Sequence, residues 1–267
     1  MDKVRIGLGW RAELSNWLDA NPDAIDCLEV TAEHFFDEGG NLLGEISSRY
    51  ATFVHGLGLS LGTPGALDEA TLQRFEQVAR TANPLWVSEH ISYTRFDGTD
   101  LGHLNPVPRS GEMVQVIADH AAEVAARCKK PIILENITSH LDPGGELSDT
   151  EFLSAICERA GCGLLIDVTN LFINAKNHKF DPYDWIRRID PSHIVQLHIV
   201  GYSLSDGVYE DHHSALIQDD LMDLLSATLD HASVRAIILE RDEDLQKANE
   251  IESELIRLRQ AAGATHV

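Results

Sequence analysis

The chain has 267 residues, of which 43% are hydrophobic and 24% are charged, so it can bury a sizeable core and does not resemble a disordered segment. Its formal net charge of −22 argues against a nucleic-acid partner, because few basic side chains are available to replace the counterions of a phosphate backbone. The sequence shows no signal peptide, no apolar run of about 18 residues and no CxxC pair, which predicts a reduced cytoplasmic protein without a membrane partner.

Short β-branched runs alternate with amphipathic helical patterns along the chain. The expected strands are Arg5–Gly9, Cys27–Thr31, Thr52–Gly56, Trp86–Ser92, Pro131–Asn136, Gly163–Val168, Ile194–Ile199 and Ala236–Glu240. Helices are expected between them, among others at Asp68–Ala82, Gly111–Cys128, Asp149–Ala160 and Asp219–His231. Ser148 and Glu151 form a capping-box pattern at the start of the third of these helices.

Eight strand–helix alternations with nearly continuous apolar strands predict a parallel sheet covered by helices. No linker divides the chain, and its length suits one (β/α)8 barrel, which needs about 250 residues. We therefore predict an α/β protein with a single TIM-barrel domain over residues 1–267. A doubly wound open sheet is the alternative, but no GxGxxG follows the first strand.

Ionisable side chains recur where the expected strands end. They are Glu29 with Glu33 and His34 after it, His55, Glu89 and His90, Glu135, Asp167, His198 and Glu240, with Asn136 and Asn170 beside them and Asp211, His212 and His213 on the loop after strand seven. Such groups are costly to bury unless they are paired or bound to a metal. In a TIM barrel the carboxyl ends of the strands converge on the active site, so this recurrence predicts a metal-dependent enzyme.

The types of ligand narrow the metal only in part. Thiolates are missing from the strand ends, which argues against a structural zinc site of the cysteine type. Imidazole with carboxylate suits iron, manganese, zinc or cobalt, and the spacing does not choose among them. About seven to nine candidate ligands exceed what one ion needs, and carboxylates can bridge neighbouring ions, so a di- or trinuclear site is expected.

These motifs resemble a known family, the multinuclear non-haem iron-dependent oxidative enzymes that modify ribosomally made peptides, such as the methanobactin-forming oxidases. The resemblance runs from Ile6 to Asp242, nearly the whole chain. The combination of LIDVTNLFINAKNH, HIVGY and a late ERD is the most specific part. The matching segments are GLGWR, EVTAEHF, HGLGLSLG, WVSEHISY, PIILENITSHL, GCGLLIDVTNLFINAKNH, VQLHIVGY, the Asp211/His213 loop and LERD.

The resemblance implies a barrel that holds two or three irons in a mixed Fe(II)/Fe(III) state and uses O2 as co-substrate. The implied metal ligands are His55, His90 and Glu135 for one iron; Glu135 again with Asp167, His198 and Glu240 for a second; and Asn170, Asp211 and His213 for a third. Glu135, Asp167 and His198 are the implied catalytic residues. We expect the third position to be the most weakly occupied, because an amide is a weak ligand and two of its ligands come from a loop.

The implied substrate is a side chain, cysteine above all, near the C-terminus of a precursor peptide. The resemblance also implies a small companion protein that captures the leader segment of that peptide. Some residues depart from the family pattern and receive no role from the sequence; they are Trp10, His34, His103, Asn105 and His140. His212, beside His213, is expected to be exposed.

Two other hypotheses stay open. A divalent-metal hydrolase or isomerase on a similar barrel, of the endonuclease-IV or sugar-isomerase type, would also use strand-end His, Asp and Glu. The hydrolase would want basic residues around the mouth for phosphate, and the chain has only 21 Lys and Arg in all. A non-catalytic metal-handling protein is the second, and the excess of ligands counts against it.

Overall fold

The computed structural model describes residues 3–37 and 40–264. Its parallel strands form a closed barrel in the order β1-β12-β9-β8-β7-β4-β3-β2. This confirms the predicted (β/α)8 fold class. The chain divides into two compact units, residues 1–29 with 166–267 and residues 30–165. Both boundaries fall inside strands, one in β2 (Cys27–Thr31) and one in β8 (Gly163–Asp167).

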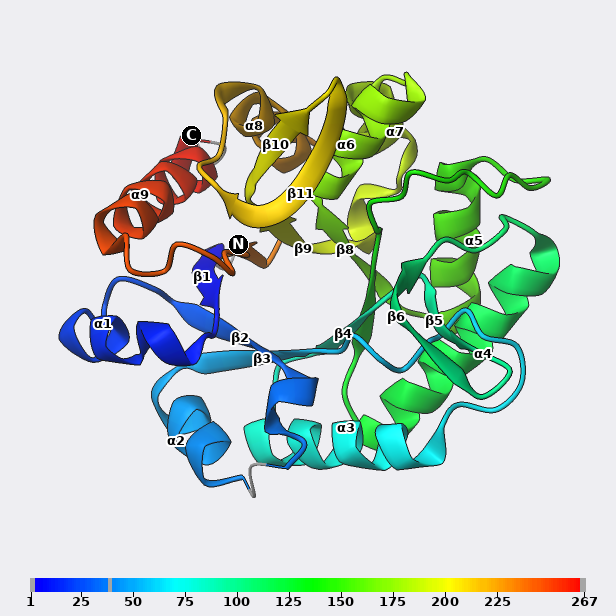
Figure 1. Ribbon diagram of the computed structural model, residues 1–267, viewed down its shortest axis with the longest axis horizontal. Coiled ribbons are helices and arrows are strands. Elements are labelled where there is room, and N and C mark those ends of the chain that lie inside the picture. Colours follow the sequence, from blue (N-terminus) through cyan, green and yellow to red (C-terminus); the bar gives the residue numbers. More distant parts are fainter. Residues whose placement is uncertain (1–2, 38–39, 265–267) are drawn as a thin grey trace. The chain divides into compact units, whose positions relative to one another are not determined.

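The unit of residues 30–165 alternates strands and helices along the chain (Figure 1). After the end of β2 it contains η2 (Ala32–Phe35), α2 (Asn41–Arg49), β3 (Ala51–His55), α3 (Glu69–Ala82), β4 (Val87–His90), β5 (Tyr93–Phe96), β6 (Thr99–Asn105), α4 (Gly111–Cys128), β7 (Ile132–Glu135), α5 (Asp149–Ala160) and the start of β8.

Side-chain caps explain where its helices begin. Asp68 precedes α3 and accepts a hydrogen bond from the Thr71 backbone amide at 2.8 Å. Ser148 and Glu151 form the predicted capping box at α5, which satisfies amides that the helix itself leaves without a partner. The predicted helices Gly111–Cys128 and Asp149–Ala160 are confirmed, and the other begins one residue later than expected.

An aromatic pair marks the core of this unit under the strand ends. The rings of Phe53 in β3 and Trp86 before β4 stack with centroids 4.3 Å apart, and both side chains are almost fully buried. Full burial of a side chain of this size contributes about 2–3 kcal/mol to stability. The strands that deliver His55 and His90 are thus held by apolar packing, not by the polar groups at their ends.

The unit of residues 1–29 and 166–267 completes the set of strands. It contains β1 (Arg5–Gly9), η1 (Ala12–Leu14), α1 (Ser15–Ala20), the start of β2, the end of β8, α6 (Val168–His178), α7 (Pro182–Arg188), η3 (Pro191–His193), β9 (Ile194–Ile199), β10 (Gly201–Ser205), β11 (Val208–Ala215), α8 (Asp219–His231), β12 (Ala236–Leu239) and α9 (Ala248–Ala264). The predicted barrel strands of both units match the observed bounds to within two residues.

Two antiparallel hairpins were not predicted, β5–β6 and β10–β11. The second turns at Asp206 and Gly207, which both have positive φ, as tight hairpin turns require. Asn177 of α6 holds the hairpin by hydrogen bonds in both directions with the Tyr209 backbone, at 2.9 and 3.1 Å. The Tyr202 ring packs on Phe172 of α6 at 5.1 Å, so the hairpin is fastened to its neighbouring helix.

None of the helices in the described part of the chain is long and apolar enough to cross a membrane.

Candidate metal centre

Three side chains converge at the strand ends of the unit of residues 30–165. His55 ends β3, His90 ends β4 and Glu135 ends β7. The Nε2 atoms of the two histidines lie 3.3 and 3.4 Å from the same oxygen, Oε2 of Glu135, and all three residues are buried. Their candidate ligand atoms lie within 4.8 Å of one another, close enough to bind one ion.

The second nitrogen of each ring is held by a neighbour. Nδ1 of His55 lies 2.8 Å from the Ser88 hydroxyl, and Nδ1 of His90 lies 3.3 Å from Oε1 of Glu89. Metal-binding histidines use their other ring nitrogen in this way, which fixes the tautomer and the ring orientation. Both rings therefore direct Nε2 toward Glu135.

Ser88 was not among the residues predicted from the sequence. The pairing of β3 with β4 could have indicated it, because Ser88 lies beside His55 in that register. It also precedes His90 by two residues, and strand alternation places such residues on one face of a sheet. A polar residue at that position next to a strand-end histidine indicates a ring-orienting partner.

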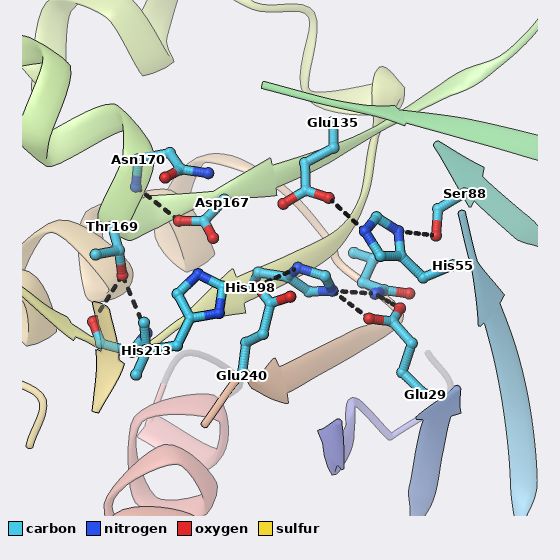
Figure 2. Close-up of polar contacts among 12 residues, drawn as sticks. Glu29, His55, Ser88, Glu135, Asp167, Thr169, Asn170, His198, His213 and Glu240 are labelled. Atoms are coloured by element: carbon cyan, nitrogen blue, oxygen red, sulfur yellow. Dashed lines mark hydrogen bonds and ion pairs between the residues drawn. The ribbon is translucent and has the colours of Figure 1, made fainter. Parts of the chain in front are cut away.

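A second group belongs to the unit of residues 1–29 and 166–267. Nδ1 of His198 in β9 lies 3.1 Å from Oε2 of Glu240, which follows β12. Candidate ligand atoms of Asp167, His198 and Glu240 lie within 4.8 Å of one another. Asp167 also caps α6, since its Oδ1 accepts the Asn170 amide at 2.7 Å, which leaves Oδ2 as its candidate ligand atom (Figure 2).

The far side of the His198 ring is held by Glu29. Oε1 of this carboxylate lies 2.7 Å from Nε2 of His198, while Oε2 accepts a hydrogen bond from Gln196 at 2.5 Å (Figure 2). Glu29 was noticed in the sequence as a strand-end residue but was not among the predicted ligands. The structure places Glu29 beside Nε2 of His198 and Glu240 beside Nδ1, so Nδ1 is the candidate ligand nitrogen of this ring.

Asp211 and His213 lie on β11, so the expectation of a loop was wrong for these two residues. The stretch VYEDHHSA has no apolar alternation, because the hairpin is half-exposed and gives no strand signal. Nε2 of His213 lies 3.0 Å from Oδ2 of Asp211. Figure 2 draws Asn170, the third predicted ligand of this position, beside Asp167 at the start of α6.

Negative charge is concentrated around His213. Burial disfavours the charged ring, but the carboxylate of Glu240 and hydrogen bonds with Asp211 and Asp242 outweigh it and raise the pKa of His213 to about 12. Carboxylates gathered this closely at a half-buried place need a positive charge among them.

The other histidines that the sequence left without a role lie away from these groups or on the surface. His34, His103 and His140 are exposed, and so is His212, as expected. His212 forms an ion pair with Glu210 at 3.3 Å. The Asn105 amide donates to the Tyr93 and His103 carbonyls within the β5–β6 hairpin, which is a structural role.

A carboxylate pair lies next to the His90 site. Oε1 of Glu33 accepts the amides of Leu57 and Gly58, each at 2.9 Å, and Glu89 accepts the amide of Leu59 at 3.0 Å. Oε2 of Glu33 is buried and has no hydrogen-bond partner among the residues that the structure describes. Burial first, and then the charge of Glu89, raise the pKa of Glu33 to about 7.

Glu33→Gln should therefore remove a pH-dependent loss of stability. The folded-state pKa of Glu33 lies above its ordinary 4.5, so its destabilising effect is absent below pH 4.5, grows as pH rises and is complete above about 7. We expect the free energy of unfolding of the variant, relative to wild type, to rise by about 2 kcal/mol between pH 5 and pH 8. Urea unfolding of the metal-free proteins measures it, with the exposed Glu123→Gln as control. A difference that does not change with pH would contradict the prediction.

Comparisons with known proteins show what the chain is similar to. Residues 5–263 match the family described as RiPP precursor modification enzyme MbnB/TglH/ChrH, where RiPP denotes a ribosomally synthesised peptide natural product. A UPF0276 protein of Caulobacter vibrioides is 30% identical over 265 residues, which are 97% of this chain and 95% of that protein. A UPF0276 protein of Shewanella sediminis is 32% identical over 259 residues, 95% and 93% of the two chains.

Solved structures share the fold at low sequence identity. A xylose isomerase domain protein from Planctomyces limnophilus aligns with a TM-score of 0.64 at 13% identity, over 99% of both chains. Endonuclease IV from Thermus thermophilus aligns with a TM-score of 0.62, also at 13% identity, over 96% of this chain and 99% of that one. At such identities the likeness supports the barrel fold and says nothing of the reaction.

Proposed function

Since the chain belongs to the MbnB/TglH/ChrH family of RiPP precursor modification enzymes, we propose that it oxidises a side chain, most simply a cysteine, of a precursor peptide with iron and O2. The observation that carries the proposal is the convergence of imidazole nitrogens and carboxylate oxygens at strand ends, in two groups each within 4.8 Å. Family membership supports the peptide as substrate. The iron, the oxygen dependence and the residue modified are the parts proposed.

The residues present fit a metal centre. Their donor atoms are imidazole nitrogens and carboxylate oxygens, a set that iron accepts. The rings of His55, His90, His198 and His213 each have one nitrogen toward a candidate ligand carboxylate and the other toward an orienting partner. The carboxylates of Asp211, Asp242 and Glu240 near His213 add negative charge that a bound cation would offset.

We propose three iron positions with the ligands implied by the sequence resemblance. His55, His90 and Glu135 hold the first; Asp167, His198 and Glu240 hold the second, with Glu135 shared between the two; Asn170, Asp211 and His213 hold the third. Glu135, Asp167 and His198 are the proposed catalytic residues. Bound iron would supply one-electron redox chemistry and the activation of O2.

The chain's own residues prepare the site for that chemistry. Glu29, Ser88 and Glu89 hold the ligand rings in one orientation, so little reorganisation is needed when a substrate arrives. His55, Glu135, Asp167 and His198 are each at most 2% exposed, which keeps bulk water from the ligands.

Turnover of a precursor peptide under controlled oxygen tests the proposal. The protein, purified without oxygen and loaded with Fe(II), is mixed with a precursor peptide. We expect O2 consumption together with a change in peptide mass that maps to one side chain. A mass change that proceeds equally without O2 would overturn the oxidase assignment in favour of a hydrolase or an isomerase.

Efficient turnover should also require a companion protein. Among the described residues the strands outside the barrel are those of two hairpins, so no separate peptide-binding module is visible there. The net charge of −22 favours a basic leader or partner face. Turnover of the full precursor should rise at least about tenfold when the companion is added, through a lower KM, as an added binding module predicts. Equal efficiency with and without it would show that the barrel recognises the peptide alone.

A further inference from the structure

The backbone of His213 makes hydrogen bonds both within β11 and to the segment after β12. Its amide donates to Oδ1 of Asp211 at 2.9 Å, and its carbonyl accepts from the amides of Asp242 and Glu243 at 2.8 and 3.3 Å. Its φ of 49° lies in the left-handed region, which is uncommon for residues other than glycine. These contacts join β11 to the segment that follows β12.

The His213 side chain also contacts the segment after β12, in addition to its backbone. Its Nε2 faces Oδ2 of Asp211 at 3.0 Å, and its Nδ1 lies 3.1 Å from Oδ2 of Asp242. The other Asp242 oxygen accepts from the guanidinium of Arg11, whose Nη1 also donates to the Trp10 carbonyl at 2.7 Å. The contacts thus run in one line from Arg11 through Asp242 and His213 to Asp211.

The segment that carries Asp242 is anchored independently of this line. The neighbouring Arg241 is only 2% exposed and forms ion pairs with Glu254 at 3.1 Å and Glu250 at 2.7 Å in α9. Glu254 in turn accepts the Ile217 amide at 2.7 Å. Asp242 is therefore presented to His213 by a rigid support, and its carboxylate can set the direction of the ring.

We propose that Asp242 and Arg11 are positioning residues for the third metal position: they direct Nε2 of His213, together with Asp211, at the ion. The inference rests on the proposed function only in taking His213 and Asp211 as ligands. A carboxylate that accepts the second N–H of a ligand histidine fixes its tautomer and raises its basicity, and losing such a partner typically weakens metal binding about 10–100-fold. Arg11 holds that carboxylate in place.

This position differs from the others in where its orienting carboxylate lies. Glu29 and Glu89, which orient His198 and His90, are at most 4% exposed, whereas the side chain of Asp242 is 39% exposed. Affinity at the third position therefore depends on a pair near the surface, and it can change without disturbing the six ligands of the other two positions. Asp242 lies two residues after Glu240, yet its substitution should act on a different ion.

Metal binding without peptide tests the inference, using Co(II) as a spectroscopic probe under anaerobic conditions. Wild type, Asp242→Asn, Asp242→Glu, Arg11→Lys and His213→Ala are titrated, and bound metal and the visible Co(II) bands are recorded. We expect Asp242→Asn to weaken the weakest-bound ion by about 10–100-fold and to leave the tighter ions unchanged. Asp242→Glu and Arg11→Lys should fall between Asp242→Asn and wild type, and His213→Ala should abolish that ion.

Asp244→Asn is the matched control, because Asp244 lies two residues further on, pairs with Lys247 at 2.6 Å and is not part of the line to His213. It should bind all ions as wild type does. Wild-type affinity in Asp242→Asn and Arg11→Lys together would overturn the inference. If Asp242→Asn fails to fold, as circular dichroism would reveal, Arg11→Lys decides alone. Metal-loaded wild type that consumes no O2 with peptide would overturn the oxidase function and leave this result intact.

Discussion

Replacing Glu135 by glutamine should remove more than one metal ion from each chain. Glu135 is 1% exposed, and its Oε2 already lies 3.3–3.4 Å from two imidazole nitrogens. A carboxylate has a second oxygen with which to bind a second ion, whereas a neutral amide of the same shape binds both ions weakly. Turnover should fall by more than about 100-fold, because the loss of a ligand costs more than the loss of a residue that only orients a ligand.

Metal analysis of anaerobically purified Glu135→Gln, set against wild type, measures this. The exposed Glu158→Gln on α5 is a matched control that should keep every ion. Circular dichroism should show the barrel intact, since apolar pairs such as Phe53 and Trp86 hold the strands. Loss of one ion with the others fully occupied would mean that the bridge lies at another residue.

Activity removed by chelation should return with iron and not with zinc. Oxidation by O2 needs a metal that changes its charge, and Zn²⁺ has no accessible redox state, although the same nitrogen and oxygen ligands bind it. We expect zinc-loaded protein to retain about 1% or less of the iron-restored turnover, a difference of at least about 2.7 kcal/mol in the activation barrier. The assay follows peptide mass and O2 together.

Protein loaded with Mn(II) distinguishes the need for a redox-active metal from the need for an occupied metal site. Manganese suits the same ligands and, unlike zinc, can change its charge. Full turnover of the peptide by protein loaded with stoichiometric zinc would contradict the oxidase proposal. It would favour the hydrolase alternative, because Zn²⁺ activates water without changing its charge.

The barrel could be predicted because its strands are buried on both faces. Continuous apolar runs such as Leu164–Ile166 and Ile237–Leu239 are visible without any knowledge of their neighbours. Charged residues that end such runs are conspicuous, and a parallel barrel collects strand ends at one mouth, so these side chains could be expected there together. The assignment of His55, His90 and Glu135 to one group came from the family resemblance, and their candidate ligand atoms do lie within 4.8 Å of one another. Local pattern and fold geometry point to the same residues here.

The hairpins and the orienting contacts could not be predicted from the sequence, for a different reason. The β10–β11 hairpin is half-exposed, so it lacks the apolar alternation that would have placed Asp211 and His213 on a strand. Arg11 and Asp242 are 231 residues apart, and nothing local to either indicates the contact. Partners of this kind follow from the three-dimensional arrangement of strands, not from the composition around each residue.

The β10–β11 hairpin is held to its neighbours at two places along β11. Asn177 of α6 is hydrogen-bonded to the backbone of Tyr209, next to the turn, and His213 is hydrogen-bonded to the segment after β12, while Leu204 and Val208 at the turn are exposed. Substitution of these two exposed side chains should therefore cost little stability, because surface changes away from packed groups usually stay within about 0.5 kcal/mol. The outer surface of the hairpin can thus vary while the backbone contacts of Tyr209 and His213 keep β11 in place.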